Sequence, residues 1–196
     1  MREPDPEDPT TMDLLAPIEA PGLKLVVVPP EVLLAAGSIG PAASVPWPEV
    51  GPISAELVAG MPISMRLRQA EGDPEVAAWL IRAIVVEDAG EPTGLRVVGH
   101  LGGHDRPDAE GVVEAGYTVA AAERGRGLAT AGVTAWFAWA HRHGARTAQL
   151  SIVADNAPSN AIAARLGLVP VERVWDEDDH VWEQVFRGPL PLHHAP

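Results

Sequence analysis

The feature that most constrains this chain is residues 111–132, "GVVEAGYTVAAAERGRGLATAG", where a strand pattern meets a helix pattern without a linker. The first ten residues are apolar and rich in valine, and they predict a strand over 111–120. Two arginines and three glycines follow in "ERGRGLATAG", and the sequence then predicts a helix from about Arg126 to His143, which Gly144 ends. Such a strand–loop–helix junction directs several unpaired backbone N–H groups at one spot, where the helix dipole adds partial positive charge.

The chemistry of this loop predicts a phosphate site. Gly125 and Gly127 allow the backbone to approach a ligand closely, and Arg124 and Arg126 add charge-assisted hydrogen bonds. The letters exclude two other phosphate motifs, because "GRGLATAG" lacks the GK[ST] of a P-loop and has Thr130 where G-x-G-x-x-G needs its third glycine.

The remaining predicted elements place this junction in a mixed fold. Hairpin strands precede it, and a strand, a capped helix and a closing hairpin follow it, which predicts an α/β domain with one central, mostly antiparallel sheet flanked by helices. The other predicted strands are 23–28, 82–86, 95–103 and 147–154, and the other predicted helices are 29–37, a short one near 55–59, one capped by Asp73, and one within 155–167.

Composition defines the expected domain organisation. Residues 1–20 carry six acids and four prolines, and we expect a disordered acidic tail there. Residues 21–188 are expected to form a single domain and 189–196 a C-terminal tail. Sheet-edge strands and the proline-rich connector over 38–62 leave a homodimer open.

Charge and composition also exclude classes of partner. A formal net charge of −13 and a pI near 4.8 argue against nucleic-acid binding and favour a cationic substrate. The chain has no cysteine, no apolar run of membrane-spanning length and no signal-peptide pattern at its acidic start, so we expect a cytoplasmic protein without a membrane contact. His100, His104, Asp105 and Asp108 gather in "GHLGGHDRPD", but two histidines four apart on a strand do not converge, and we expect no metal site.

Three motifs in order carry a family resemblance. "RGRGLA" fits R/Q-x-x-G-x-G/A, "EAGYTVA" precedes it, and "ADNAPSNAIAARLGL" follows it. Together they resemble the GNAT superfamily of acyl-CoA-dependent N-acetyltransferases, and the "GYxV" strand with the N-x-x-S signature resembles the RimJ/RimL-type branch that acetylates ribosomal-protein N-termini.

The resemblance implies acetyl-CoA as cosubstrate, an acceptor amine, and a twisted sheet that is splayed between strands 112–120 and 147–154. Backbone groups of Val119 and Ala121 would pair with the pantetheine arm, and Asn156 would hydrogen-bond the arm from the far side. The resemblance assigns the pyrophosphate to the N–H groups of Arg124, Gly125, Arg126, Gly127, Leu128 and Ala129.

The catalytic residues are less clearly defined by the resemblance. Glu114 lies where the family often places its base, and the alternative is a solvated strand glutamate. Ser159 is a candidate proton donor to the leaving thiolate, or a helix cap. Ala163 replaces the tyrosine acid of many relatives, and Ser151 occupies another base position.

Two other functions stay open beside an N-acetyltransferase that acts by direct amine attack on the thioester, and the departures at Ala163 and Ser151 motivate the first of them. One is a catalytically weak acyl-CoA-binding or regulatory module of the same fold. The other is a protein that binds a different nucleotide at the same helix end.

Overall fold

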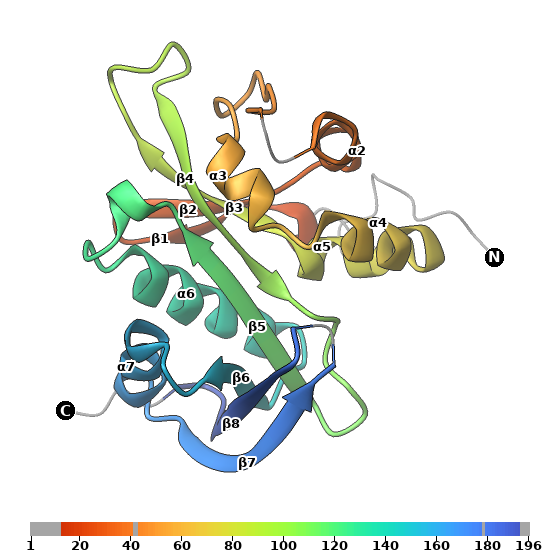
Figure 1. The fold of residues 1–196 in the computed structure, drawn as a ribbon, viewed down its shortest axis with the longest axis vertical. Helices are drawn as coiled ribbons and strands as arrows, with labels where there is room; N and C mark the ends of the chain where they lie inside the picture. The colour runs from red at the N-terminus through yellow and green to blue at the C-terminus, as the bar shows by residue number, and fades with distance from the viewer. Residues whose placement is uncertain (1–12, 41–42, 178, 193–196) are drawn as a thin grey trace. The chain divides into compact units, whose positions relative to one another are not determined.

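The computed structural model describes residues 13–40, 43–177 and 179–192, and its strands form one eight-stranded sheet in the order β1-β2-β3-β4-β5-β6-β8-β7 (Figure 1). Strand β5 pairs with β6 in parallel, whereas the pairs β1–β2, β2–β3, β3–β4, β6–β8 and β7–β8 are antiparallel. The predicted mixed α/β class with a mostly antiparallel sheet is confirmed. The strands are β1 (Ile18–Ala20), β2 (Leu23–Val27), β3 (Arg82–Glu87), β4 (Leu95–Gly103), β5 (Val112–Val119), β6 (Thr147–Val153), β7 (Val169–Asp176) and β8 (Val181–Pro189).

The helices connect these strands. Seven of them bear on the fold: α2 (Pro30–Ile39), α3 (Ala55–Ala59), α4 (Ile63–Gly72), α5 (Ala77–Leu80), the 3₁₀ turn η2 (Ala121–Glu123), α6 (Leu128–Arg142) and α7 (Ala157–Arg165). A further 3₁₀ turn, η1 (Pro74–Val76), precedes α5, and Asp73 Oδ1 caps it by accepting from Glu75 N at 3.1 Å. The cap therefore works as the sequence predicts.

Contacts divide the chain into two compact units, described separately below. Unit 1 comprises Met1–Gly102 and Tyr117–Gly132, and unit 2 comprises Gly103–Gly116 and Val133–Pro196. The boundary passes through β5 and α6, so each unit holds part of the predicted strand–loop–helix junction.

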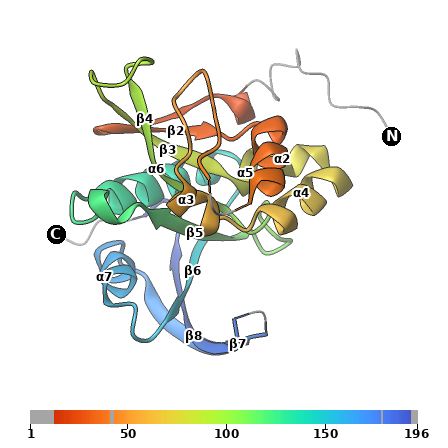
Figure 2. The same cartoon turned by 45° about the horizontal axis from the view of Figure 1, so that its top comes forward.

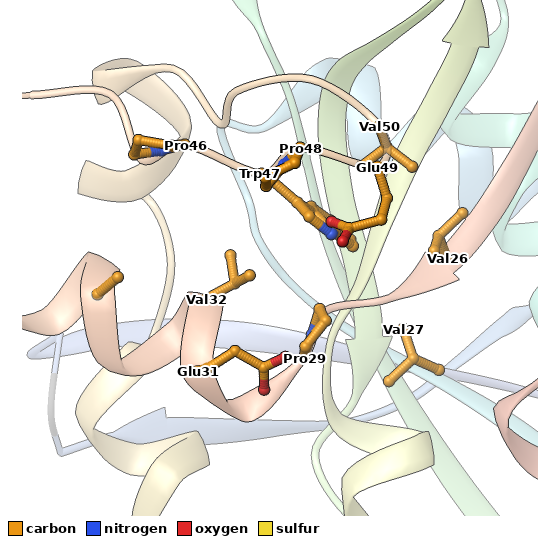
Figure 3. A pocket seen from close by; sticks show the side chains of 11 residues that line it. Val26, Val27, Pro29, Glu31, Val32, Pro46, Trp47, Pro48, Glu49 and Val50 are labelled. Atoms are coloured by element: carbon orange, nitrogen blue, oxygen red, sulfur yellow. The ribbon is translucent and has the colours of Figure 1, made fainter. Parts of the chain in front are cut away.

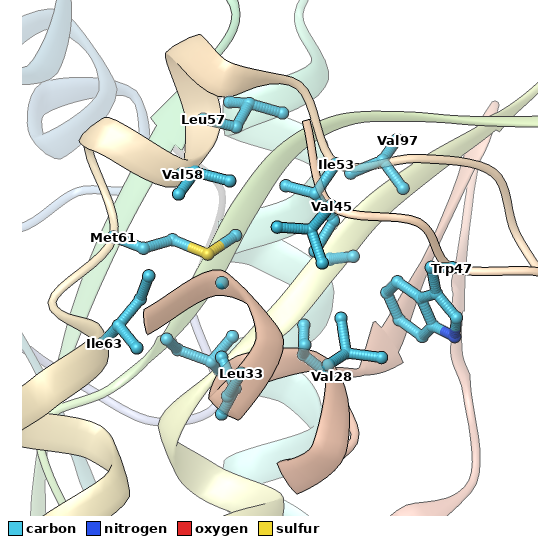
Figure 4. Packing of buried hydrophobic residues seen from close by; sticks show 14 of the residues in the cluster. Val28, Leu33, Val45, Trp47, Ile53, Leu57, Val58, Met61, Ile63 and Val97 are labelled. Carbon is cyan, nitrogen blue, oxygen red and sulfur yellow. The ribbon is translucent and has the colours of Figure 1, made fainter. Parts of the chain in front are cut away.

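Unit 1 has a core that includes the proline-rich connector (Figure 4). Val45 and Ile53 form an isolated antiparallel bridge, and both are fully buried. Trp47 lies between them in the chain and is 4% exposed. These side chains pack against α2, α3 and β3 and hold the connector on the core. Removal of apolar area from water stabilises the folded state by roughly 25 cal/mol per Å².

Unit 2 is built on the pairing of β6 with β8, which lie side by side in Figure 2. Along β6, buried Ala148, Leu150 and Ile152 alternate with partly exposed residues that include Gln149 and Ser151. This alternation of period two leaves one face of the strand available for polar chemistry.

The structure differs from the sequence-based expectation at the N-terminal segment and at α4. Ile18–Ala20 form β1 rather than part of a disordered tail, while residues 1–12 of the expected tail lie outside the described residues. Fully buried Arg82 donates to the carbonyls of Leu14 and Ala16, which ties this segment to β3. Helix α4 was not predicted because its polar sequence follows Pro62 without a capping side chain.

The C-terminal expectation also changes. Strand β8 extends to Pro189, the first residue of the expected tail, and residues 193–196 lie outside the described residues. Among the helices that the structure describes, none is long and apolar enough to span a bilayer.

Candidate functional site

The glycines of the loop in unit 1 adopt a left-handed backbone conformation. Gly125 and Gly127 have φ values of +77° and +79°, a conformation that residues with a side chain rarely adopt. A Cβ at either position would meet no atom of the described chain within 4 Å. Helix α6 begins at Leu128, two residues later than expected, and the N–H groups of Leu128, Ala129 and Thr130 precede its first backbone hydrogen bond, from Ala131 N to Gly127 O at 3.0 Å. The loop therefore offers open backbone donors at a helix N-terminus.

Glu123 partly neutralises Arg126 of the loop. Its carboxylate pairs with Arg96 at 2.6 Å and also with Arg126, and the residue is 7% exposed. The hydrogen bond from Arg96 is the main cause that holds the pKa of Glu123 below its usual value. Glu123 thus stays ionised at neutral pH and orients Arg126.

The two backbone positions expected to pair with pantetheine are already engaged. Ala121 N donates to Glu56 Oε1 at 2.8 Å, and Val119 O accepts from Arg124 Nε at 3.1 Å. Glu56 lies in the first turn of α3 and is exposed. A ligand that pairs with these backbone groups must therefore displace two side-chain contacts.

In unit 2, Glu114 belongs to a chain of polar contacts. Gln149 Nε2 donates to Glu114 Oε2 at 2.7 Å, Arg187 Nε donates to Gln149 Oε1 at 2.7 Å, and Arg187 pairs with Glu172 at 3.2 Å. Strand pairing explains the chain, because Glu114 lies opposite Gln149 and Gln149 lies opposite Arg187. The β5–β6 ladder covers three residue pairs and ends at Glu114 and Gln149.

Glu183 on β8 is a carboxylate influenced by the charge of Glu114, and the sequence analysis did not identify it. Its register opposite Val153 places it on the same sheet face as Gln149 and Ser151. Burial raises the pKa of its carboxyl, and the charges of Asp176, Glu114 and Asp179 raise it further. The sequence shows only a glutamate in a hairpin, and its relation to Glu114 appears once β8 is known to pair with β6.

The motif residues on α7 have a structural task. Asn156 Oδ1 accepts from Ser159 N at 3.2 Å, so Asn156 caps the helix and Ser159 supplies the N–H. Ala163 is fully buried on α7, and its small side chain holds no acid. Asn156 and Ser159 are thus brought together in unit 2, where Glu114 also lies.

The two histidines of "GHLGGH" belong to different units. His104 Nδ1 lies 3.8 Å from Glu114 Oε2 in unit 2 and is exposed. His100 lies in unit 1 and is 6% exposed, and burial lowers the pKa of its ring to about 4.

A separate cavity of about 520 Å³ lies in unit 1 (Figure 3). Its walls come from β2, the start of α2 and the connector around Trp47, with Glu31 and Glu49 as its carboxylates. None of the predicted site residues lines it, so we assign it no part in the acyl-transfer chemistry.

Solved structures share this fold. Mycobacterium smegmatis RimJ, in complex with CoA-disulfide, is 19% identical with a TM-score of 0.56, over 90% of this chain and 88% of that one. RimL, described as a ribosomal L7/L12 alpha-N-protein acetyltransferase, is 14% identical with a TM-score of 0.57, over 89% and 94%. The microcin C7 self-immunity acetyltransferase MccE, in complex with acetyl-CoA and AMP, is 15% identical with a TM-score of 0.57, over 86% and 93%.

No curated protein matches the sequence at a significant level. The family described as "Acetyltransferase (GNAT) domain" matches residues 41–169, which include most of the connector, the glycine loop and the Asn156 motif. The chain therefore belongs to the GNAT family of acetyl-CoA-dependent acetyltransferases.

Proposed function

We propose that this acetyltransferase acts on a primary amine, either a protein N-terminus or a small-molecule amine. The observation that carries the proposal is the glycine loop, whose two positive-φ glycines and helix N-terminus form an open set of donors for phosphate oxygens. RimL is described as an acetyltransferase of a protein N-terminus, and this favours a protein acceptor as the first class to test.

In unit 1, the loop would bind the pyrophosphate of acetyl-CoA. The N–H groups of Leu128 and Ala129 belong to the first turn of α6, and Arg124 and Arg126 supply charge. The remaining backbone donors would come from Gly125 and Gly127. Val119 and Ala121 would pair with the pantetheine arm after Arg124 and Glu56 release them.

In unit 2, Glu114 would be the base that takes the amine proton. A lysine-like amine of pKa near 10.4 is almost fully protonated at neutral pH, so attack requires a proton acceptor. Glu183 and Asp176 add negative charge on the same side and would attract a protonated amine. Asn156 would hold the pantetheine arm, and Ser159 would protonate the leaving thiolate.

Thermal unfolding with acetyl-CoA is the first test, with ATP and NAD as controls. A ligand at about 100 times its dissociation constant adds about 2.7 kcal/mol of stability, which raises the Tm of a chain this size by several degrees. A rise with acetyl-CoA alone supports the proposal, and no rise at millimolar acetyl-CoA contradicts it.

CoA release then identifies the acceptor. Peptides with free N-termini, diamines and small aromatic amines should be compared at equal concentration. If acetyl-CoA binds but none of these acceptors causes CoA release, the weakly catalytic acyl-CoA-binding module is favoured. Ala163 motivates this alternative, because it is fully buried and replaces the tyrosine acid of many relatives.

A further inference from the structure

A histidine is buried in unit 1, and no hydrogen bond of normal geometry satisfies one of its ring nitrogens. His100 on β4 is 6% exposed, and its Nε2 makes no hydrogen bond of normal geometry to any group in the described part of the chain. A hydrogen bond with the Gly60 backbone raises the pKa of the ring, but by less than burial lowers it. A buried polar atom without a partner costs about 1–3 kcal/mol, so its presence calls for a physical explanation such as a bound group.

This nitrogen lies beside the end of β5. Ala120 N donates to Val98 O at 2.9 Å, which places β4 alongside β5 just past Thr118. A Cβ built on Gly60 would lie 3.8 Å from His100 Nε2 and 3.6 Å from Thr118 Cγ2. His100, Thr118 and Gly60 therefore meet at one point, next to Val119, the residue assigned above to the pantetheine arm.

The electrostatics at this point suit an oxygen that gains negative charge. Burial lowers the pKa of the His100 ring, and the nearby charge of Arg66 on α4 lowers it further. The ring is therefore neutral at pH 7 and carries one N–H. Arg66 is itself 5% exposed, and its Nη1 donates to Gln69 Oε1 at 2.9 Å, which fixes the guanidinium in place. A positive, desolvated environment would repel an ammonium group but stabilise a developing oxyanion.

We propose that His100 Nε2–H donates a hydrogen bond to the carbonyl oxygen of the acetyl thioester and polarises it for attack. The amine lone pair forms the N–C bond as the C=O electrons move onto this oxygen. The C=O bond then re-forms as the C–S bond breaks, the thiolate accepts a proton, and the amine nitrogen loses one to the base. His100 remains neutral throughout, so it acts as a hydrogen-bond donor and not as a proton carrier.

The inference rests on the proposed function, because it places the thioester next to Val119. The two can fail separately. If acetyl-CoA does not raise the Tm of the wild-type protein, the proposed function fails. If acetyl-CoA binds and turns over but His100 variants behave as wild type, only this inference fails.

The experiment compares wild type with His100→Leu and His100→Gln. Infrared difference spectra of bound acetyl-CoA, labelled with ¹³C at the thioester carbonyl, should show a lower carbonyl frequency in wild type than in His100→Leu. The kcat of His100→Leu should fall about 100-fold, as for loss of one oxyanion donor, with little change in KM for acetyl-CoA. His100→Gln places an amide N–H near the Nε2 position and should restore part of both signals.

The pH profile separates donor from base. Loss of a donor lowers kcat by the same factor from pH 6 to pH 9, whereas loss of a base costs most below the pKa of the amine. A pH-dependent ratio, or an unchanged carbonyl frequency in His100→Leu, would overturn the proposal.

Gly60→Ala keeps the test valid if His100 variants do not fold. Its φ is −91°, and the new methyl meets its neighbours at ordinary contact distances of 3.6–3.8 Å, so the fold should tolerate it. The methyl would stand against Nε2 and should lower kcat and raise the carbonyl frequency at unchanged Tm. Gly37→Ala on α2, with a contact of 3.5 Å to Ile63, is the matched control and should change neither. Wild-type kcat in Gly60→Ala would contradict the proposal.

Discussion

The glycine loop of unit 1 and the polar chain of unit 2 hold their expected functional groups in different ways. In unit 1, Ala121 N is held by the exposed carboxylate of Glu56, and the exposed side chain of Arg126 pairs with Glu123. In unit 2, Glu114 and Gln149 are linked through partly buried contacts of 2.7 Å that follow strand pairing.

This difference in how the groups are held predicts that the two units engage their ligands differently. The contact of Glu56 with Ala121 N is exposed and exchanges at low cost, since surface contacts of charged side chains contribute roughly 0–1 kcal/mol, whereas Glu123 in the Arg126 pair is buried. Contacts that a sheet register imposes are fixed before a ligand arrives. We therefore expect unit 1 to bind by exchange of partners and unit 2 to present its carboxylate already oriented.

The largest effect is expected from Gly127→Glu, which attacks the loop itself. The new side chain adds bulk and negative charge at the phosphate site, and acetyl-CoA affinity should fall by about 1,000-fold, or ~4 kcal/mol, measured by calorimetry. The φ of +79° also strains any residue other than glycine.

Gly144→Glu separates strain from binding. Gly144 has a φ of +99° and open space at its Cβ, and it lies after α6 rather than in the loop. The Gly144→Glu variant should lose about as much stability as Gly127→Glu but keep the acetyl-CoA affinity of the wild type. Equal loss of affinity in both variants would show that the loop is not the phosphate site.

The next effect concerns the oriented carboxylate. Glu114→Gln keeps a hydrogen-bonding amide opposite Gln149 but removes the base, so kcat should fall about 100-fold below the pKa of the amine. The loss should shrink as pH rises and the free amine accumulates. Glu172→Gln, at the exposed far end of the chain, should change kcat by about twofold or less. Equal rates for Glu114→Gln and wild type at low pH would remove Glu114 as base.

The sequence predicted local features well and distant pairings poorly. The Asp73 cap and the strand predicted over 111–120, observed at Val112–Val119, follow from chemistry within a few residues. Glu183 could not be predicted, because its role depends on β8 pairing with β6, about 30 residues earlier in the chain.

Structure also changed the interpretation of residues that the sequence had identified. His100 appeared as half of a weak metal pattern, and only burial and its position beside Thr118 separate it from His104. Asn156 was expected to bind the cofactor, and its Oδ1 is also the cap of α7. Engagement of Ala121 N by Glu56 joins residues 65 apart in sequence, a distance at which local patterns carry no signal.

The smallest effect should come from Glu56→Gln, and it bears directly on the exchange proposed for unit 1. A neutral amide competes less well than a carboxylate for Ala121 N, so acetyl-CoA should bind about 3- to 10-fold more tightly, in line with a net hydrogen-bond contribution of roughly 0.5–1.5 kcal/mol. Removal of a negative charge near an anionic ligand also tightens binding, and high salt should screen this charge contribution alone.

Glu49→Gln is the control, because it removes another exposed carboxylate of unit 1 and so reports the charge effect without the hydrogen bond. If both variants tighten binding equally and the gain disappears in high salt, Glu56 acts only as a charge. If Glu56→Gln weakens binding, the carboxylate assists the cofactor rather than competing with it, and the contrast between an exchanging unit 1 and a fixed unit 2 is wrong.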